Sequence, residues 1–237
     1  MSHEEATMSL LEHLEELRRR LIIIVATVLV AAIVGFIFAQ RIIDLLIERL
    51  PAGYEKLYFT GVADAFGVLI KVALFAGIAI AMPVILYQVW RFVTPGLTTR
   101  ERRVVWPLLL GALGLFALGV VVGYVIIPFA LNFLLSFAEP GKIEPLLTIN
   151  EYIGFVTTMM LAFGLVLEFP IVLIALARVG ILSYRRIAAQ RRFIILGITI
   201  FAIVVTPGGD PFSPTILGVV MYVLFEVSLL IIRLIRR

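Results

Sequence analysis

The chain has 237 residues, of which 62% are hydrophobic and only 15% charged, with a formal net charge of +4 and no cysteine. This composition excludes a soluble globular domain and predicts a polytopic membrane protein. The lack of cysteine also excludes disulfide frameworks, thiolate metal sites and thiol nucleophiles.

The first twenty residues are predicted to form a separate amphipathic helix on the cytoplasmic membrane surface. Ser9 and Glu12 have the spacing of a capping box. Apolar residues then recur at helical spacing on one face, at Leu10, Leu14, Leu17 and Leu21. No small-residue cleavage site precedes the first apolar run, so we expect that run to be retained as a membrane span.

Six apolar spans follow, which predicts an all-α fold in a single membrane domain of residues 1–237. They cover residues 21–40, 67–90, 104–128, 153–177, 193–206 and 214–232. After the third span, Pro128 and Asn132 indicate that the chain leaves the membrane and continues along its surface.

The fifth span is unusually short. A helix of its thirteen uncharged residues, 193–205, is about 20 Å long, whereas the hydrocarbon core is about 30 Å thick. Either neighbouring helices shield this helix, or the fifth and sixth spans thin the bilayer locally.

The positive residues predict the orientation. Fifteen of the 20 lysines and arginines lie before the first span, after the sixth, or in the second–third and fourth–fifth connections. Because cytoplasmic loops carry an excess of Lys and Arg, we expect both termini in the cytoplasm.

The fourth span carries a lone carboxylate, Glu168, followed by Pro170. A charged residue at this depth costs about 2.5–3.5 kcal/mol to insert, and proline removes a backbone donor and favours a kink. We expect the position to face protein or water, either through a structural partner on another span or in a functional contact. Glu226 in the sixth span lies seven residues before Arg233, which is expected to offset its charge in part, so a structural role is equally compatible there.

No motif supports catalysis. The chain has no P-loop, no glycine-rich dinucleotide motif, no His-Glu-x-x-His and no Gly-x-Ser-x-Gly. Both histidines precede the first span, and no aspartate pair lies in a span. We therefore predict that the protein is not an enzyme and has no cofactor, no metal and no nucleic-acid partner.

Two acidic points lie on the basic side of the protein. Glu101 stands between Arg100 and Arg102, and Glu15 with Glu16 precedes Arg18. These carboxylates either balance local charge or recognise guanidinium groups in bidentate fashion, which lysine cannot reproduce. A ligand with paired arginines and a following apolar segment would suit such a surface.

Five segments together are similar to TatC, the multispanning receptor subunit of the twin-arginine protein translocase. They are His13 to Arg18, Phe92 to Leu97 followed by Glu101 to Arg103, Phe163 to Pro170, Thr206 to Ser213, and Met221 to Glu226. The resemblance covers nearly the whole chain in order, with six spans and cytoplasmic termini.

This resemblance implies a receptor in the bacterial cytoplasmic (inner) membrane that binds twin-arginine signal peptides of folded precursors. Its implied partners are the single-span proteins TatA and TatB, further TatC copies and membrane lipid, and the proton gradient drives transport. The implied signal-peptide contacts are Glu16, Arg18, Phe92, Glu101, Arg102 and Arg103. Intramembrane partner or translocation contacts are Glu168, Pro170 and Glu226, and the outer-face elements include Pro51 and Asp210.

Two other classes remain open on the residues alone. A proton-coupled secondary transporter would also keep an intramembrane Glu and proline-broken helices, although no internal repeat relates the two halves. A structural scaffold or insertase-like subunit without ligand specificity is the second alternative.

Overall fold

The computed structural model describes residues 10–51, 53–54, 56–93, 99–138, 145–178 and 182–235, and for residues 10, 93, 99–105, 178, 186 and 235 it describes the backbone only. Within these ranges the chain forms eight α-helices and no strand beyond one isolated bridge. The helices are α1 (Leu10–Ile47), α2 (Asp64–Val93), α3 (Thr99–Leu135), α4 (Ile149–Val166), α5 (Phe169–Arg178), α6 (Tyr184–Ala189), α7 (Arg191–Val205) and α8 (Phe212–Ile235). The predicted all-α class is confirmed.

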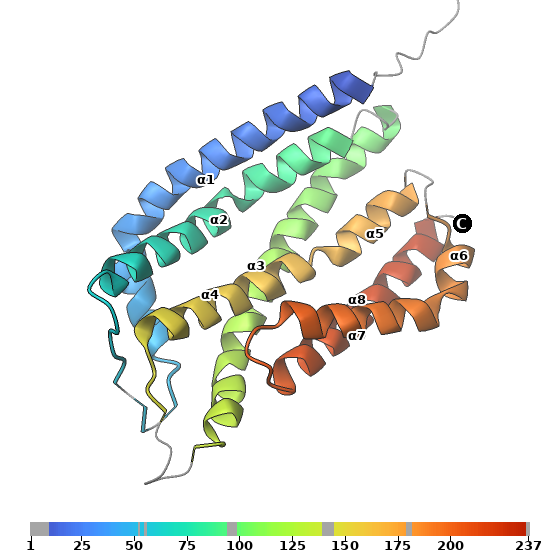
Figure 1. The fold of residues 1–237 in the computed structure, drawn as a ribbon. Coiled ribbons are helices and arrows are strands. Elements are labelled where there is room, and N and C mark those ends of the chain that lie inside the picture. Colours follow the sequence, from blue (N-terminus) through green and yellow to red (C-terminus); the bar gives the residue numbers. More distant parts are fainter. Residues whose placement is uncertain are drawn as a thin grey trace, which may run out of the picture.

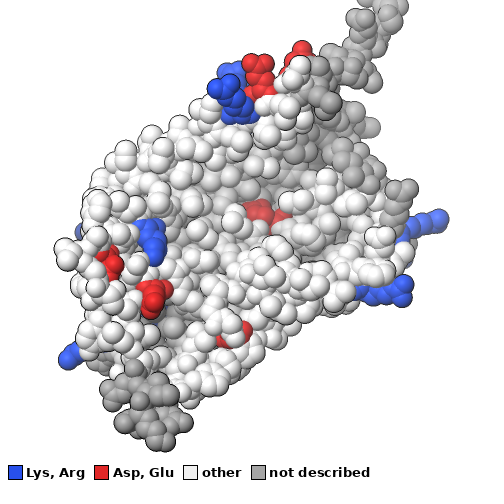
Figure 2. Space-filling model, viewed as in Figure 1, with Lys and Arg blue, Asp and Glu red and all other residues white. Residues whose placement is uncertain are grey.

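The helices form a layer with one hollowed face. α1 lies along α2, α2 packs on α4, α5 packs on α8, and α7 lies along α8, while α3 crosses α4 (Figure 1). Figure 2 views the same face as a space-filling surface and shows a largely uncharged hollow with charged side chains gathered toward its ends. We call the end that holds the start of α1 and the end of α2 the arginine-rich end.

Glycine lets two helix pairs approach closely. A Cβ atom on Gly77 of α2 would lie 2.8 Å from the Ala32 backbone of α1. A Cβ atom on Gly119 of α3 would lie 2.7 Å from the Cα atom of Gly164 in α4. Small residues at such crossings are typical of membrane helix pairs, because association depends on close backbone packing rather than on hydrophobic exclusion.

The α7–α8 pair lacks this feature. A Cβ atom on Gly197 of α7 would meet no atom within 4 Å, and one on Gly218 of α8 would meet only the Ala202 side chain, at 3.9 Å. Both glycines therefore leave space beside their helices instead of bringing them together.

α4 and α5 are the two halves of the predicted fourth span, residues 153–177. The Glu168 amide donates to the Leu165 carbonyl, three residues back rather than four, at 3.2 Å. Pro170 has no N–H group, so the Val166 carbonyl lacks its usual helical donor. The kink expected here is present as a complete break between two helices.

Five helical stretches in the described residues are long and apolar enough to cross a membrane. They are Leu11–Ile47, Asp64–Phe92, Trp106–Leu135, Ile149–Ala177 and Phe212–Leu234. The 15 residues of α7 match the predicted fifth span in position, but they extend only about 22 Å. That α7 crosses the bilayer, as a sixth span, stays a prediction.

Several elements differ from the sequence prediction. α1 begins at Leu10 and continues without a break, because no glycine or proline lies between Leu10 and Val34, so residues 10–20 are its first turns and not a separate element. α3 continues past Pro128 to Leu135, and the Asn132 side-chain amide donates to the Pro128 carbonyl at 2.7 Å. The short helix α6 was not predicted.

Two tyrosines hold the far end of α1. The Tyr124 hydroxyl donates to the Leu45 carbonyl at 2.9 Å, and the buried Tyr152 hydroxyl donates to the Leu46 carbonyl at 2.5 Å. The last carbonyls of a helix lack intrahelical donors, so these bonds satisfy the end of α1 and join it to α3 and α4.

Candidate functional site

The first candidate site is a groove of about 850 Å³ at the arginine-rich end, between α1 and α2. We call it the acidic groove because three carboxylates of one helix line it. Its charged lining residues are Glu12, Glu15, Glu16, Arg18, Arg19, Arg20 and Arg91. The groove thus offers acceptor oxygens for a cationic ligand, together with four arginines of the chain itself.

An aromatic stack fixes the start of α1 against the end of α2. The His13 and Phe92 rings lie 4.3 Å apart between centroids, with an interplanar angle of 16°. His13 lies about one helical turn before Glu16, so the stack brings Phe92 to the same end of the α1–α2 pair as the carboxylate. The structure therefore gathers two predicted ligand contacts, and their role stays a prediction.

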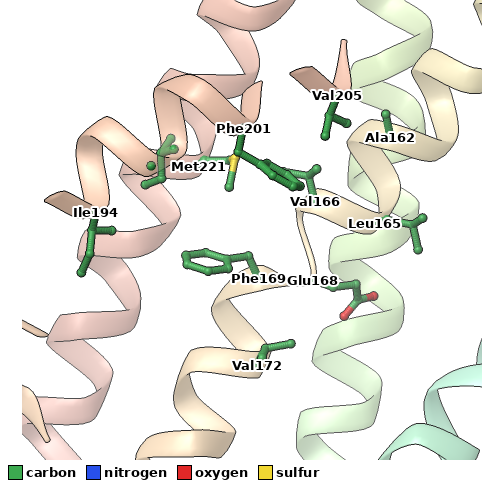
Figure 3. A pocket seen from close by; sticks show the side chains of 12 residues that line it. Ala162, Leu165, Val166, Glu168, Phe169, Val172, Ile194, Phe201, Val205 and Met221 are labelled. Atoms are coloured by element: carbon green, nitrogen blue, oxygen red, sulfur yellow. The ribbon is translucent and has the colours of Figure 1, made fainter. Parts of the chain in front are cut away.

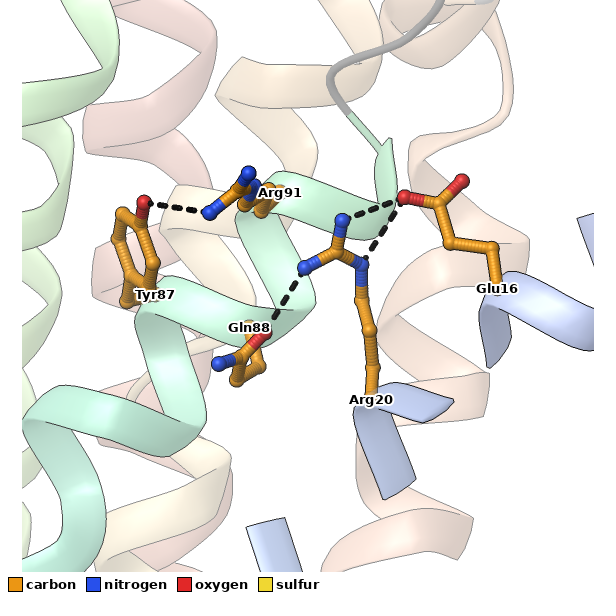
Figure 4. A network of polar contacts seen from close by, with 5 residues as sticks. All are labelled: Glu16, Arg20, Tyr87, Gln88 and Arg91. Carbon is orange, nitrogen blue, oxygen red and sulfur yellow. Dashed lines mark hydrogen bonds and ion pairs between the residues drawn. The ribbon is translucent and has the colours of Figure 1, made fainter. Parts of the chain in front are cut away.

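Glu16 is already engaged by the chain (Figure 4). The Arg20 Nε and Nη2 atoms both donate to Glu16 Oε1, the first at 3.1 Å, and Arg20 Nη1 donates to Gln88 Oε1 at 2.8 Å. Neither Arg20 nor Gln88 was predicted as a site residue. The i, i+4 spacing of Glu16 and Arg20 is the signal that could have found the ion pair.

The other predicted signal-peptide contacts divide into two sets. Arg18 lines the acidic groove with Glu16. The side chains of Glu101, Arg102 and Arg103 lie outside the described residues, and their backbone belongs to α3.

A second groove, of about 670 Å³, lies in the apolar middle of the molecule, lined by α4, α5, α7 and α8. We call it the intramembrane groove. Eleven of its 12 lining residues are apolar and the other is Glu168 (Figure 3). Figure 3 shows Glu168 at the break between the two half-helices, with Phe169 and Val172 following on α5 and Phe201 on α7 across the groove.

Glu168 lacks a compensating partner among the described residues. Its Oε1 atom is buried without a hydrogen bond, and no ion pair joins it to another described helix. Burying an unsatisfied carboxylate oxygen is costly, and an apolar residue would pack here at lower free energy. Such an intramembrane carboxylate is a candidate for a functional contact. Pro170 contributes by opening the backbone beside it.

Glu226 has an ion-pair partner that was not predicted. Its Oε2 atom accepts from Arg191 Nη2 of α7 at 2.9 Å, whereas the Arg233 guanidinium lies 5.9 Å from the Tyr184 ring centre. The direct ion pair therefore comes from a neighbouring helix, and the partial offset by Arg233 stays a prediction.

The predicted outer-face residues shape turns at the opposite end. Asp210 is buried, and its Oδ1 atom accepts from the Ser213 amide at 2.7 Å, which caps the start of α8. The Pro51 carbonyl accepts from the Tyr54 amide at 3.1 Å after α1 ends. Within the described ranges, no three His, Asp or Glu side chains lie close enough together to hold a metal ion.

Comparison with known proteins covers most of the chain. The family model for "Sec-independent protein translocase protein (TatC)" matches residues 12–219. The chain belongs to the TatC family. Among curated TatC proteins, that of Deinococcus radiodurans is 37% identical over 242 residues, covering 98% of this chain and 88% of the relative. That of Aquifex aeolicus is 35% identical and covers 97% of each chain.

A solved structure agrees with the family assignment. A crystal structure of the twin-arginine translocase receptor TatC in DDM matches with a TM-score of 0.80 and 35% identity, covering 93% of this chain and 99% of that one. The resemblance seen in the sequence is confirmed. The protein is thus a TatC-family component of Sec-independent protein translocation, which sets aside the secondary-transporter alternative; the family is one of transport proteins.

Proposed function

We propose that this protein is the receptor subunit of a twin-arginine translocase. It binds twin-arginine signal peptides of folded precursors and, with TatA and TatB partners and further TatC copies, mediates their export using the proton gradient. It works in the bacterial cytoplasmic membrane, with both termini in the cytoplasm, as the distribution of arginine in the sequence supports.

The observation that carries the proposal is the acidic groove in a TatC-family chain. Carboxylates bind guanidinium groups through two parallel hydrogen bonds, and a lysine ammonium cannot match this geometry. Glu16 already holds a guanidinium, that of Arg20, with both Nε and Nη2, so its environment is compatible with one. Phe92 supplies an adjacent aromatic face, and Glu101, Arg102 and Arg103 complete the proposed surface.

The intramembrane groove has a separate proposed task. Its apolar lining suits a helix from a partner or the apolar segment of a precursor. Glu168 offers that helix one hydrogen-bond acceptor. Pro170 lies at the break between α4 and α5, and Glu226 joins α8 to α7 through Arg191. Pro51 and Asp210 hold the outer turns in place, away from the signal-peptide contacts.

The receptor proposal is tested by direct binding. The purified protein in bilayer nanodiscs is titrated with a fluorescent signal peptide carrying two arginines and with the same peptide carrying two lysines. We expect the twin-arginine peptide to bind roughly tenfold more tightly or better, a difference of about 1.4 kcal/mol. Equal affinities for the two peptides would refute the receptor function.

A matched pair of variants locates the site. Glu16→Gln removes a carboxylate charge from the acidic groove and is expected to reduce the preference for arginine. Glu151→Gln removes an exposed carboxylate at the opposite end of the molecule and is expected to leave the preference unchanged. A preference that survives Glu16→Gln in full would place the arginine contact elsewhere.

A further inference from the structure

We propose that Arg20 is a resident competitor for the ligand's arginine: it occupies Glu16 in the empty receptor and returns to Glu16 when the ligand leaves. The inference rests on the proposed function and adds that a residue of the chain itself controls the affinity for the ligand. Arg20 and Gln88 are the residues that set this control.

The ion pair fills one of the two Glu16 oxygens that a bidentate ligand arginine would need. Two nitrogens of the Arg20 fork, Nε and Nη2, bind the same carboxylate oxygen, so the face of Glu16 toward α2 is filled (Figure 4). The two side chains are only 13% and 17% exposed. An external guanidinium can therefore take this position only by displacing Arg20.

Shielding makes the competition strong. Exposed ion pairs contribute little, but removal of one partner from a shielded pair leaves an uncompensated charge. Arg20 removes that penalty from the empty receptor, and any ligand cation must break the existing pair before it gains its own. The second oxygen, Glu16 Oε2, is buried without a partner among the described residues, so a ligand does not reach it while the pair is in place.

Gln88 keeps the Arg20 side chain near Glu16 after the ligand has displaced it. Its Oε1 atom accepts from Arg20 Nη1 at 2.8 Å, and this bond does not involve Glu16. Gln88 is buried and uncharged, so it fixes one nitrogen of the guanidinium without neutralising it. After displacement from Glu16, Arg20 stays tethered to α2 and is placed to recapture the carboxylate, which accelerates release of the ligand.

Arg91 provides a contrast within the same groove. Its Nη1 atom donates to the Tyr87 hydroxyl at 3.2 Å, on its own helix, and no described ion pair joins it to a groove carboxylate. Arg91 therefore contributes positive potential but does not occupy Glu16. This difference separates competition for one carboxylate from general repulsion of a cationic peptide.

The test measures affinity and dissociation rate of the twin-arginine peptide in nanodiscs. Arg20→Gln removes the competitor, so we expect binding about tenfold tighter or more, mostly through slower dissociation. Arg20→Lys keeps the charge but not the fork, and should give a smaller change in the same direction. Arg91→Gln should change affinity by less than Arg20→Gln.

A double variant completes the test. In a Glu16→Gln background, Arg20→Gln should change affinity by no more than Arg91→Gln does, because the contested carboxylate is gone and only general repulsion remains. Weaker or unchanged peptide binding by Arg20→Gln would overturn the inference, since Arg20 would then only orient Glu16. If Arg20→Gln does not fold, Arg20→Lys replaces it: tighter peptide binding supports the inference, and weaker or unchanged binding overturns it. Equal binding of arginine and lysine peptides to the wild type would instead overturn the proposed function itself.

Discussion

The contact between α3 and α4 gives a prediction that can be worked from distances. In Gly119→Ala the new methyl carbon would lie 2.7 Å from the Gly164 Cα atom. Ordinary carbon contacts are about 3.5–4.0 Å, so the two helices must separate by roughly 1 Å. Forcing extra volume into a packed contact costs about 1–3 kcal/mol.

Gly114→Ala is the matched control, because it lies on the same helix with no atom within 4 Å of the added carbon. Alanine gains about 1 kcal/mol of helix propensity over glycine at either position, and this gain cancels between the variants. We therefore expect Gly119→Ala to be about 1–3 kcal/mol less stable than Gly114→Ala. Reversible unfolding of both variants in mixed micelles with increasing SDS measures the difference.

The same variant has a functional readout. Gly164 lies four residues before Glu168, about one helical turn, so moving α4 away from α3 also shifts the intramembrane carboxylate. Gly119→Ala should then reduce export of a folded precursor, while Gly114→Ala should not. Equal stability of the two variants would refute the close approach of α3 and α4 and the argument built on it.

Three further predictions concern single side chains. Glu168→Ala should reduce precursor export roughly 5- to 30-fold in cells lacking their own TatC, with less effect on signal-peptide affinity, since one polar contact between membrane helices contributes about 1–2 kcal/mol; wild-type export would show the residue to be dispensable. Tyr152→Phe removes the bond to the Leu46 carbonyl and should lower the free energy of unfolding by about 0.5–1.5 kcal/mol, and unchanged stability would contradict that bond. A double-mutant cycle on Arg191 and Glu226 should give a coupling of about 0.2–1 kcal/mol, because both side chains are partly exposed; a larger coupling would mean that the pair is shielded in the membrane.

Local patterns predicted the elements that depend only on neighbouring residues. Long apolar runs identified the spanning helices, and the nearness of Glu168 to Pro170 identified the break between α4 and α5. Thirteen uncharged residues identified α7 as short. The family motif then placed Glu16 and Phe92 in one site, which spacing alone could not do.

Contacts between residues far apart in the sequence could not be predicted, because they depend on how the helices are placed against one another. Arg20 meets Gln88 across 68 positions of sequence, through the alignment of α1 and α2 that their small residues permit. For Glu226, same-helix spacing pointed only to a partial charge offset by Arg233. The ion-pair partner of Glu226, Arg191, comes from a helix 35 residues earlier.

The intramembrane groove has two walls of different stiffness, because glycine brings α4 close to α3 but does not bring α7 close to α8. The α4 wall is backed by α3 at backbone contact distance, so it resists displacement. Among the described helices the α7 wall packs mainly against α8, and Gly197, which lines the groove, leaves open space beside it. A helix entering the groove would therefore be accommodated by movement of α7 while α4 stays fixed, and amide hydrogen exchange should be faster along α7 than along α4 before that helix arrives.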